Sequence, residues 1–149
     1  VETADEMLVA TQDNLPTDVA IFSAAVADFK INKRYENKIK KQDSLNLNLE
    51  KNVDILNYIS NHNSMRPDLV IGFAAETDNL IKNAKDKLKK KNADMIVAND
   101  VSKSGAGFEE DTNIAHLVYD KNSEELPLMP KSHLARIIFD RISDIKKNQ

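Results

Sequence analysis

With 149 residues and 41% hydrophobic residues, the chain is long enough to bury the core of one domain of ordinary size. Its 21 basic and 24 acidic residues nearly cancel, and the formal net charge of -3 argues against nucleic acid or an anionic membrane as the main partner. The chain has no cysteine, which excludes disulfides, thiolate metal sites and catalytic thiols. Because it contains neither a membrane-length apolar run nor a signal-peptide pattern, we expect a cytoplasmic protein.

The first predicted element is a helix over residues 4–12. Thr3, followed three residues later by Glu6, has the spacing of a capping box at the start of that helix. The next element is a nearly continuous apolar run over residues 19–26, which is followed by Asp28. Such a run is typical of a strand that is buried on both faces of a parallel sheet.

Two more apolar runs, over residues 69–75 and 95–98, each end in polar residues. Helical periodicity precedes each of them, over residues 55–59 and 81–88. Strands that alternate with helices predict parallel crossovers, so we expect an α/β fold: a three-layer, Rossmann-like sandwich with a mostly parallel sheet.

The remaining elements are predicted to lie at the edge of this sheet or beside it. Leucines alternate with polar residues over 45–49, which predicts a strand with one solvent-exposed face in a small edge or dimerisation arm. Residues 30–43 are polar and without periodicity, and are a candidate mobile loop. Residues 114–119 predict a further strand, and residues 134–145 a closing amphipathic helix.

Ligands of open α/β sheets bind beyond the carboxyl ends of the strands, so the residues after each apolar run are the first site candidates. The small residues 24–27 would let a base or a ribose approach the backbone, and the carboxylate of Asp28 could hold a hydroxyl or an amine. Taken alone, Asp28 is better explained as an aspartate that opens a loop after a tightly packed strand.

Lysines supply candidate phosphate ligands in two places. Lys38, Lys40 and Lys41 lie in the loop after Asp28, and their compact charges could follow a triphosphate, although such runs are more often merely solvated. In the predicted helix after residue 78, Lys87 and Lys91 lie one turn apart beside the apolar stripe and could lean towards a phosphate. The other lysines of that helix point away.

Other site types have little support. Residues 105–108 contain two glycines and could form an anion cradle or a lid. No phosphate-binding loop of the G-x-x-x-x-G-K-S/T type and no G-x-G-x-x-G turn is present. The histidines are scattered, which makes a zinc site or a histidine base improbable, and we predict no metal-ligating residues.

Five strings occur in the order and at the spacing found in one family, and on them the chain resembles the bacterial phosphopantothenoylcysteine synthetases over essentially all of its length. The GFAAET string and the lysine-rich flap over residues 38–41 are specific to that family. The five strings are AAVADF (24–29), KIKKQ (38–42), KNVDIL (51–56), GFAAET (72–77) and VAND (97–100).

The resemblance implies a ligase that uses CTP with Mg²⁺ to join 4'-phosphopantothenate to cysteine in coenzyme A biosynthesis. The carboxylate of 4'-phosphopantothenate attacks the α-phosphorus to give an acyl-cytidylate, and the cysteine amine then displaces CMP. The resemblance assigns catalytic roles to Lys38 and Asp28. The nucleotide-binding residues that it implies are Ser23, Ala24, Asp28, Lys38, Val53, Asp54, Ile55, Leu56, Phe73, Lys87 and Lys91.

The resemblance also implies a homodimer, with residues 45–49 as the candidate interface, and a fusion to or pairing with a flavin-dependent phosphopantothenoylcysteine decarboxylase. Family members begin with a glycine- and serine-rich phosphate loop that carries a catalytic asparagine, and we expect residues 1–149 to be a single synthetase domain that starts after this loop. Two alternatives stay open. One is a nicotinamide-dependent reductase, although its glycine-rich first turn is missing. The other is a nucleotide-binding or structural domain without chemistry of its own.

Overall fold

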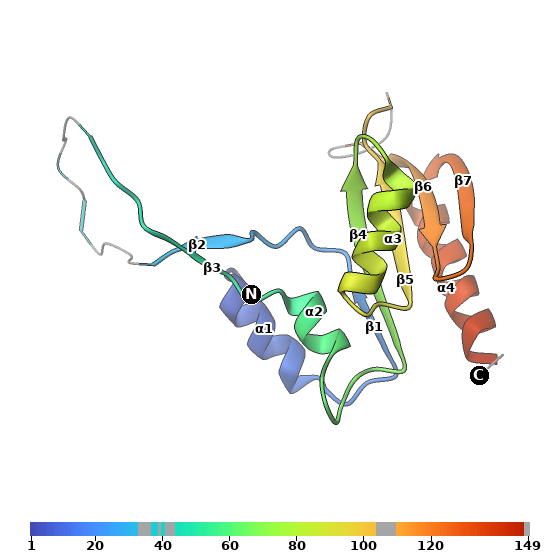
Figure 1. Ribbon diagram of the computed structural model, residues 1–149, viewed down its shortest axis with the longest axis horizontal. Helices are drawn as coiled ribbons and strands as arrows, with labels where there is room; N and C mark the ends of the chain where they lie inside the picture. Colours follow the sequence, from blue (N-terminus) through green and yellow to red (C-terminus); the bar gives the residue numbers. More distant parts are fainter. Residues whose placement is uncertain (33–36, 39, 41–43, 104–109, 148–149) are drawn as a thin grey trace.

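The computed structural model of the chain describes residues 1–32, 37–38, 40, 44–103 and 110–147. One five-stranded sheet has the order β1-β4-β5-β6-β7, and β2 pairs with β3 in a separate two-stranded sheet (Figure 1). We call β2 and β3, with the chain between them, the arm. In chain order the elements are α1 (Ala4–Asp13), β1 (Val19–Phe22), β2 (Phe29–Ile31), β3 (Leu49–Lys51), α2 (Ile55–Ser60), β4 (Leu69–Glu76), α3 (Leu80–Lys90), β5 (Met95–Asp100), β6 (Thr112–Val118), β7 (Ser123–Pro130) and α4 (Lys131–Lys147).

Most strands of the sheet run in one direction. β1, β4 and β5 are parallel neighbours, while β6 is antiparallel to both β5 and β7, so that β6 alone runs the other way. β1 is an edge strand and pairs only with residues 69–72 of β4. Because β4 continues to Glu76, its last residues extend past the end of β1. This step in the sheet edge positions the candidate site.

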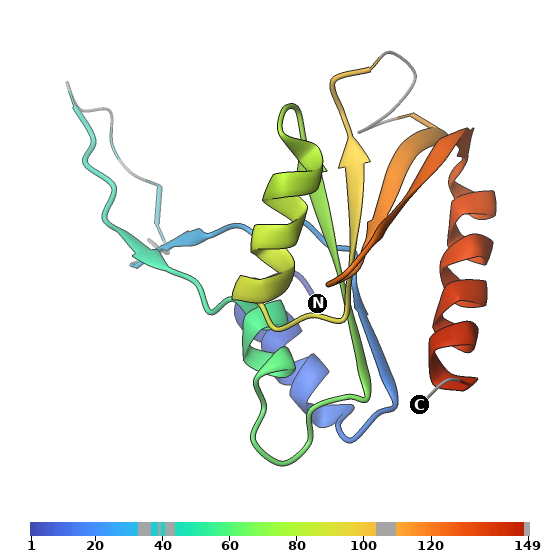
Figure 2. The ribbon, with the colours of Figure 1, turned by 45° about the vertical axis from the view of Figure 1, so that its right-hand side comes forward.

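Helices cover both faces of the sheet, as Figure 2 shows. Leu69 and Ile71 of β4 belong to the core cluster that α4 closes, whereas Ala74 belongs to the cluster that α3 closes. These alternating partners follow from the two-residue period of a strand. The predicted three-layer α/β sandwich with its small arm is confirmed. No helix among the described residues is long and apolar enough to cross a membrane.

Of the first two predicted elements, the helix is confirmed and the strand is shorter than predicted. The helix over residues 4–12 is confirmed as α1, and both bonds of its capping box form: the Glu6 N–H donates to Thr3 Oγ1 over 3.2 Å, and the Thr3 N–H donates to Glu6 Oε2 over 3.1 Å. The strand over residues 19–26 was predicted too long and too buried, because β1 ends at Phe22 and lies at the sheet edge. The small residues after Phe22 leave the sheet and are exposed.

The arm departs from its prediction in length. Only the last leucine of residues 45–49 lies in a strand, at the start of β3, since its partner β2 is just three residues long.

The strand predicted over 114–119 is found as β6, and the closing helix as α4. β7 was not predicted, because Pro127 and the charges at Glu124 and Glu125 interrupt its apolar pattern; an edge strand tolerates such residues.

Candidate functional site

A cleft with a volume of about 1080 Å³ lies at the step where β1 ends and β4 continues. Its walls come from α1, from the segment after β1, from the stretch that leads into α2 and from the end of α3. The structure therefore brings together all the predicted nucleotide-binding residues except Lys38. Those that line the cleft are Ser23, Ala24, Asp28, Val53, Asp54, Ile55, Leu56, Phe73, Lys87 and Lys91.

Asn52 fixes the backbone on both sides of Asp28. Its own N–H donates to the Asp28 carbonyl over 2.8 Å, and its side-chain Nδ2 donates to the Ala27 carbonyl over 2.8 Å. Asn52 is only 8% exposed, so these bonds are shielded from water. Sequence reasoning passed over Asn52, although it lies within the KNVDIL string directly before Val53.

Asp54 joins the start of α2 to the end of α3. One carboxylate oxygen caps α2 by accepting the Asn57 N–H over 2.9 Å, and the other forms a hydrogen-bonded ion pair with Lys91 Nζ. Burial alone would raise the pKa of Asp54, but the bonds from Lys91 and Asn57 and the charges of Lys91 and Lys87 hold it below its ordinary value. The predicted position of Lys91 in the cleft follows from this contact.

Lys87 lies one turn before Lys91 and reaches into the same cleft, where its Nζ donates to the Phe73 carbonyl over 2.8 Å. Burial lowers the pKa of Lys87, and the charge of Lys91 lowers it further, against the opposing charges of Glu76, Asp54 and Asp28. An ammonium group that has lost part of its hydration is stabilised when an anion binds beside it, and a phosphate can supply this negative charge.

Gly72 allows α2 to pack closely on the sheet beside the cleft. A Cβ atom at this position would lie 2.7 Å from Cδ2 of Leu56 and 3.0 Å from Cδ1 of Ile96. The missing side chain therefore makes room for Leu56, which is both a core residue and part of the cleft wall. The glycine of the GFAAET string has a packing role here.

Phe73 and Lys38 are placed differently from what the resemblance implied. The carbonyl of Phe73 binds Lys87, but its partly buried ring packs against the core cluster on the α4 face. Lys38 is exposed and is not among the described residues that line the cleft, and the arm that carries it extends away from the sheet (Figure 1). Contact between Lys38 and a phosphate therefore requires either a different position of the arm or the arm of a second copy of the chain. Ile39, Lys41 and the glycine loop over 105–108 lie outside the described residues.

Lys90 and Asn99 are further polar residues of the cleft wall that were not predicted as site residues. Lys90 lies at the end of α3 between Lys87 and Lys91, and Asn99 lines the cleft from β5. The Asn99 Oδ1 atom is buried without a hydrogen-bond partner among the described residues. Its position in the VAND string was the available signal. Within the same residues, no group of three or more histidine, aspartate or glutamate side chains could hold a metal ion.

The sequence profile of the family described as "DNA/pantothenate metabolism flavoprotein C-terminal domain" matches residues 1–145. The chain belongs to this family. Among relatives of this flavoprotein C-terminal domain, the coenzyme A biosynthesis bifunctional protein CoaBC of Bacillus subtilis is 41% identical over 133 residues, which cover 88% of the chain and 32% of the relative. The CoaBC of Escherichia coli K12 is 39% identical over 147 residues, which cover 95% of the chain and 36% of the relative. The chain thus spans about a third of the length of these curated relatives.

Solved structures of this family have the same fold. The crystal structure of the C-terminal domain of a CoaBC protein superimposes with a TM-score of 0.76 at 37% identity, covering 100% of the chain and 67% of that structure. The DNA/pantothenate metabolism flavoprotein from Streptococcus pneumoniae gives a TM-score of 0.76 at 21% identity, covering 97% and 71%, and supports the fold alone. The resemblance stated from the five strings is thereby confirmed at the level of the family.

Proposed function

We propose that this chain forms the nucleotide half of a cytoplasmic, CTP-dependent phosphopantothenate–cysteine ligase of coenzyme A biosynthesis. The names of its relatives, coenzyme A biosynthesis bifunctional proteins, support the pathway. The observation that carries the nucleotide assignment is the cleft itself, which gathers Asp28, Lys87 and Lys91 beyond the end of the parallel strand β1.

The cleft offers different chemistry along its length. Ser23 and Ala24 present small side chains after β1, so that a base and ribose can approach the backbone there. Lys87 and Lys91 lie on the α3 side, where their charges would stabilise a triphosphate and the pyrophosphate that leaves from it. Asp28 is exposed in the same cleft, and we assign its carboxylate to a ribose hydroxyl or to the incoming amine.

The proposed reaction needs positioning and charge stabilisation more than covalent help from the protein. A carboxylate oxygen of 4'-phosphopantothenate bonds to the α-phosphorus of CTP as the bond to pyrophosphate breaks. The amine of cysteine then bonds to the acyl carbon, loses a proton and displaces CMP. We propose that Mg²⁺ binds together with CTP, because Mg²⁺ is usually held through substrate phosphates rather than by a dedicated cage of protein ligands.

The partners proposed for the whole protein follow the same relatives. The name "bifunctional" of the CoaBC proteins supports a fusion with a second enzyme, which we propose to be the flavin-dependent decarboxylase. We also propose a homodimer that forms through the arm, whose apolar side chains are exposed. A nicotinamide-dependent reductase and a domain without chemistry remain as the competing hypotheses.

Calorimetric titration with CTP and Mg²⁺ tests the nucleotide assignment, with ATP and NADH as controls. Binding of CTP that is clearly tighter than that of ATP and NADH is the expected result. Preference for NADH would instead establish the reductase hypothesis. If none of the three nucleotides binds to the folded protein, the cleft is not a complete nucleotide site and the proposal fails.

The role of the flap is tested by Lys38→Gln, because Lys38 lies on the flap and is not among the described residues that line the cleft of its own chain. In the full-length protein we expect synthetase turnover to fall about 100-fold or more, the range for loss of one preorganised charge-stabilising donor. Lys82→Gln is the matched control, since Lys82 is an exposed lysine of α3 outside the cleft wall. Turnover of Lys38→Gln within a few-fold of the control would remove Lys38 from the mechanism.

A further inference from the structure

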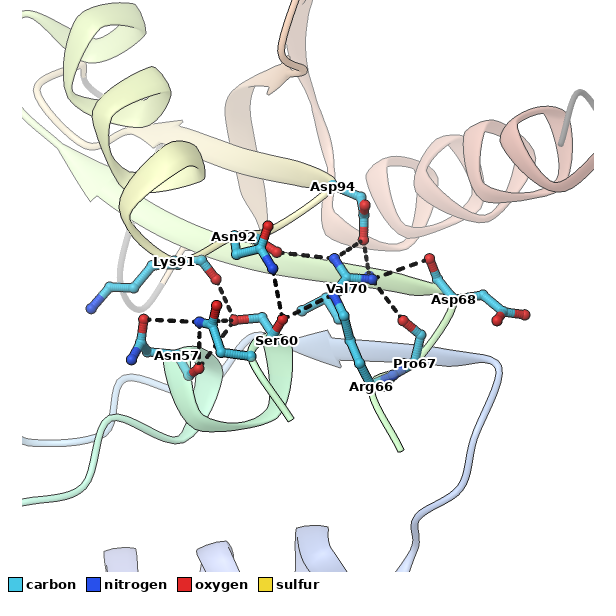
Figure 3. Close-up of polar contacts among 10 residues, drawn as sticks. Asn57, Ser60, Arg66, Pro67, Asp68, Val70, Lys91, Asn92 and Asp94 are labelled. Atoms are coloured by element: carbon cyan, nitrogen blue, oxygen red, sulfur yellow. Dashed lines mark hydrogen bonds and ion pairs between the residues drawn. The ribbon is translucent and has the colours of Figure 1, made fainter. Parts of the chain in front are cut away.

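The carboxyl-terminal ends of α2 and α3 meet near the start of β4 (Figure 3). α2 ends at Ser60, and α3 is followed by its C-cap Lys91 and by Asn92, whose φ of 50° is in the left-handed region common after a helix. Helix ends carry carbonyls without intrahelical partners and a partial negative charge. Two such ends repel each other unless donors are placed between them.

Arg66 supplies these donors from one guanidinium group, as the dashed lines in Figure 3 show. Its Nε donates to the Ser60 carbonyl over 2.9 Å, and its Nη2 donates to the Asn92 carbonyl over 3.0 Å. The Nη2 atom also forms an ion pair with Asp94 over 3.0 Å. The planar, fixed geometry of the guanidinium lets it reach both helix ends at once, which a lysine ammonium cannot reproduce.

Ser60 adds a direct link between the two helices. It is fully buried, and its Oγ donates to the carbonyl of Lys91. The Nδ2 atom of Asn92 returns a bond to the Ser60 carbonyl over 3.0 Å. The backbone of Lys91 is thus tied to the last residue of α2, while its ammonium is tied to Asp54 at the first turn of the same helix.

α2 is only six residues long, so these two contacts hold Lys91 at both ends against one short, rigid element. Neither Arg66 nor Ser60 is among the described residues that line the cleft. Loss of the guanidinium would leave the Asn92 carbonyl without its Arg66 donor and the buried Ser60 carbonyl with the Asn92 amide alone, so the contact between the two helix ends would loosen. Such a shift carries Lys91 away from Asp54 and from the cleft.

We infer that Arg66 and Ser60 are positioning residues that hold the ammonium of Lys91 in the cleft, where it meets the phosphates of the nucleotide. The reference to a nucleotide rests on the proposed function, whereas the placement of Lys91 does not. Two measurements therefore test the two parts separately.

The first measurement needs no nucleotide. Arg66→Lys keeps the positive charge but loses the planar set of donors that reaches both helix ends. In this variant the Asp54–Lys91 pair should loosen, and the pKa of Asp54 should rise towards its ordinary value. A carbon-detected NMR titration of the carboxylates measures this pKa, and Asp54→Asn assigns the signal. Arg141→Lys is the matched control, because Arg141 makes a comparable fork with Glu124 on the α4 side, with N–O distances of 2.6 and 2.8 Å.

The second measurement compares the affinities for CTP and CMP by calorimetry, because only CTP carries the phosphates that Lys91 is expected to meet. The preference for CTP over CMP should fall about 10-fold in Arg66→Lys, the size of one lost hydrogen bond to a charged group, and should stay unchanged in Arg141→Lys. A residue that merely stabilises the fold would weaken both ligands alike or neither.

The outcomes are distinct. An unchanged pKa of Asp54 in folded Arg66→Lys overturns the inference, and an unchanged preference for CTP overturns its nucleotide part. If the pKa rises but the wild-type protein binds no CTP, the positioning role stands and the proposed function fails. If Arg66→Lys does not fold, Ser60→Ala replaces it in both measurements, because this change removes only the hydroxyl. It should also raise the pKa of Asp54 and lower the preference for CTP over CMP.

Discussion

Asp54 contributes to folding as well as to the cleft, and its contribution depends on pH. Its pKa is lowered from the ordinary value of 3.8, so the folded state favours the charged form. The resulting stability is fully present above the unfolded pKa and is lost as the pH falls through the folded pKa. The asparagine in Asp54→Asn can still cap α2, since asparagine and aspartate are equally good N-caps.

We therefore predict that Asp54→Asn is less stable than the wild type at neutral pH, and that this difference in the free energy of unfolding shrinks below about pH 4. Urea unfolding at a series of pH values measures it. Asp86→Asn, at an exposed position of α3 outside the cleft, is the control variant. A difference for Asp54→Asn that is as large in acid as at neutral pH would contradict the assigned ion pair.

The lowered pKa of Lys87 gives a second prediction at the level of a single residue. A phosphate beside this partly buried ammonium would raise its pKa again, so binding of CTP at alkaline pH should take up protons. The heat of binding should then depend on the ionisation enthalpy of the buffer. This dependence should vanish in Lys87→Arg, whose guanidinium stays protonated, and persist in Lys82→Arg. Equal heats for the wild type in different buffers would place Lys87 outside the phosphate site.

At the scale of elements, the contact between α2 and β4 depends on Gly72. In Gly72→Ala the new Cβ would lie 2.7 Å from Leu56 Cδ2, so Leu56 and the start of α2 must shift. We expect a loss of about 1–3 kcal/mol in the free energy of unfolding, as for other overpacked cores, together with weaker CTP binding. Leu56→Ala removes the clashing atoms, so its own cost should be smaller in the Gly72→Ala background than in the wild type. Strictly additive costs in this double-mutant cycle would show that the two residues do not touch.

The sequence predicted those elements whose cause is local. The capping box of α1 depends on two residues three apart, and the placing of Lys87 and Lys91 depends on the helical period beside an apolar stripe. Both are encoded by spacing along the chain. The roles of Asn52 and Arg66 were not predictable in this way, because their partners are backbone carbonyls from distant segments, and any residue type carries a carbonyl.

The lengths of two strands were predicted wrongly for a related reason. An apolar or alternating run shows which residues can pair, but the partner determines how many do. β1 ends at Phe22 although the apolar run continues, and β3 begins only at Leu49 although the alternation begins at Leu45. In both cases the residues left unpaired became functional candidates: the cleft wall after β1 and the exposed leucines of the arm.

At the scale of the whole molecule, the arm is the feature that a single copy of the chain does not explain. It extends from the body of the molecule as two strands of three residues (Figure 1). Phe29, Ile31 and Leu49 on these strands are 58%, 47% and 58% exposed. An isolated two-stranded hairpin is marginally stable in water, and exposed apolar patches mark interaction sites. The proposed homodimer would cover these side chains with a second copy of the arm.

Charges on this surface should therefore separate the copies without unfolding them. We predict that the wild-type protein sediments as a dimer and that the double variant Ile31→Lys, Leu49→Lys sediments as a monomer, because burying two unpaired ammonium groups costs more than the arm contact provides. Phe139→Lys is the matched control, since this side chain of α4 is 60% exposed and far from the arm in the sequence, and it should leave the dimer intact. A monomeric wild type, or a double variant that stays dimeric, would exclude the arm as the interface. Circular dichroism of the double variant should keep the signal of the sheet and helices, because both positions lie outside the two core clusters.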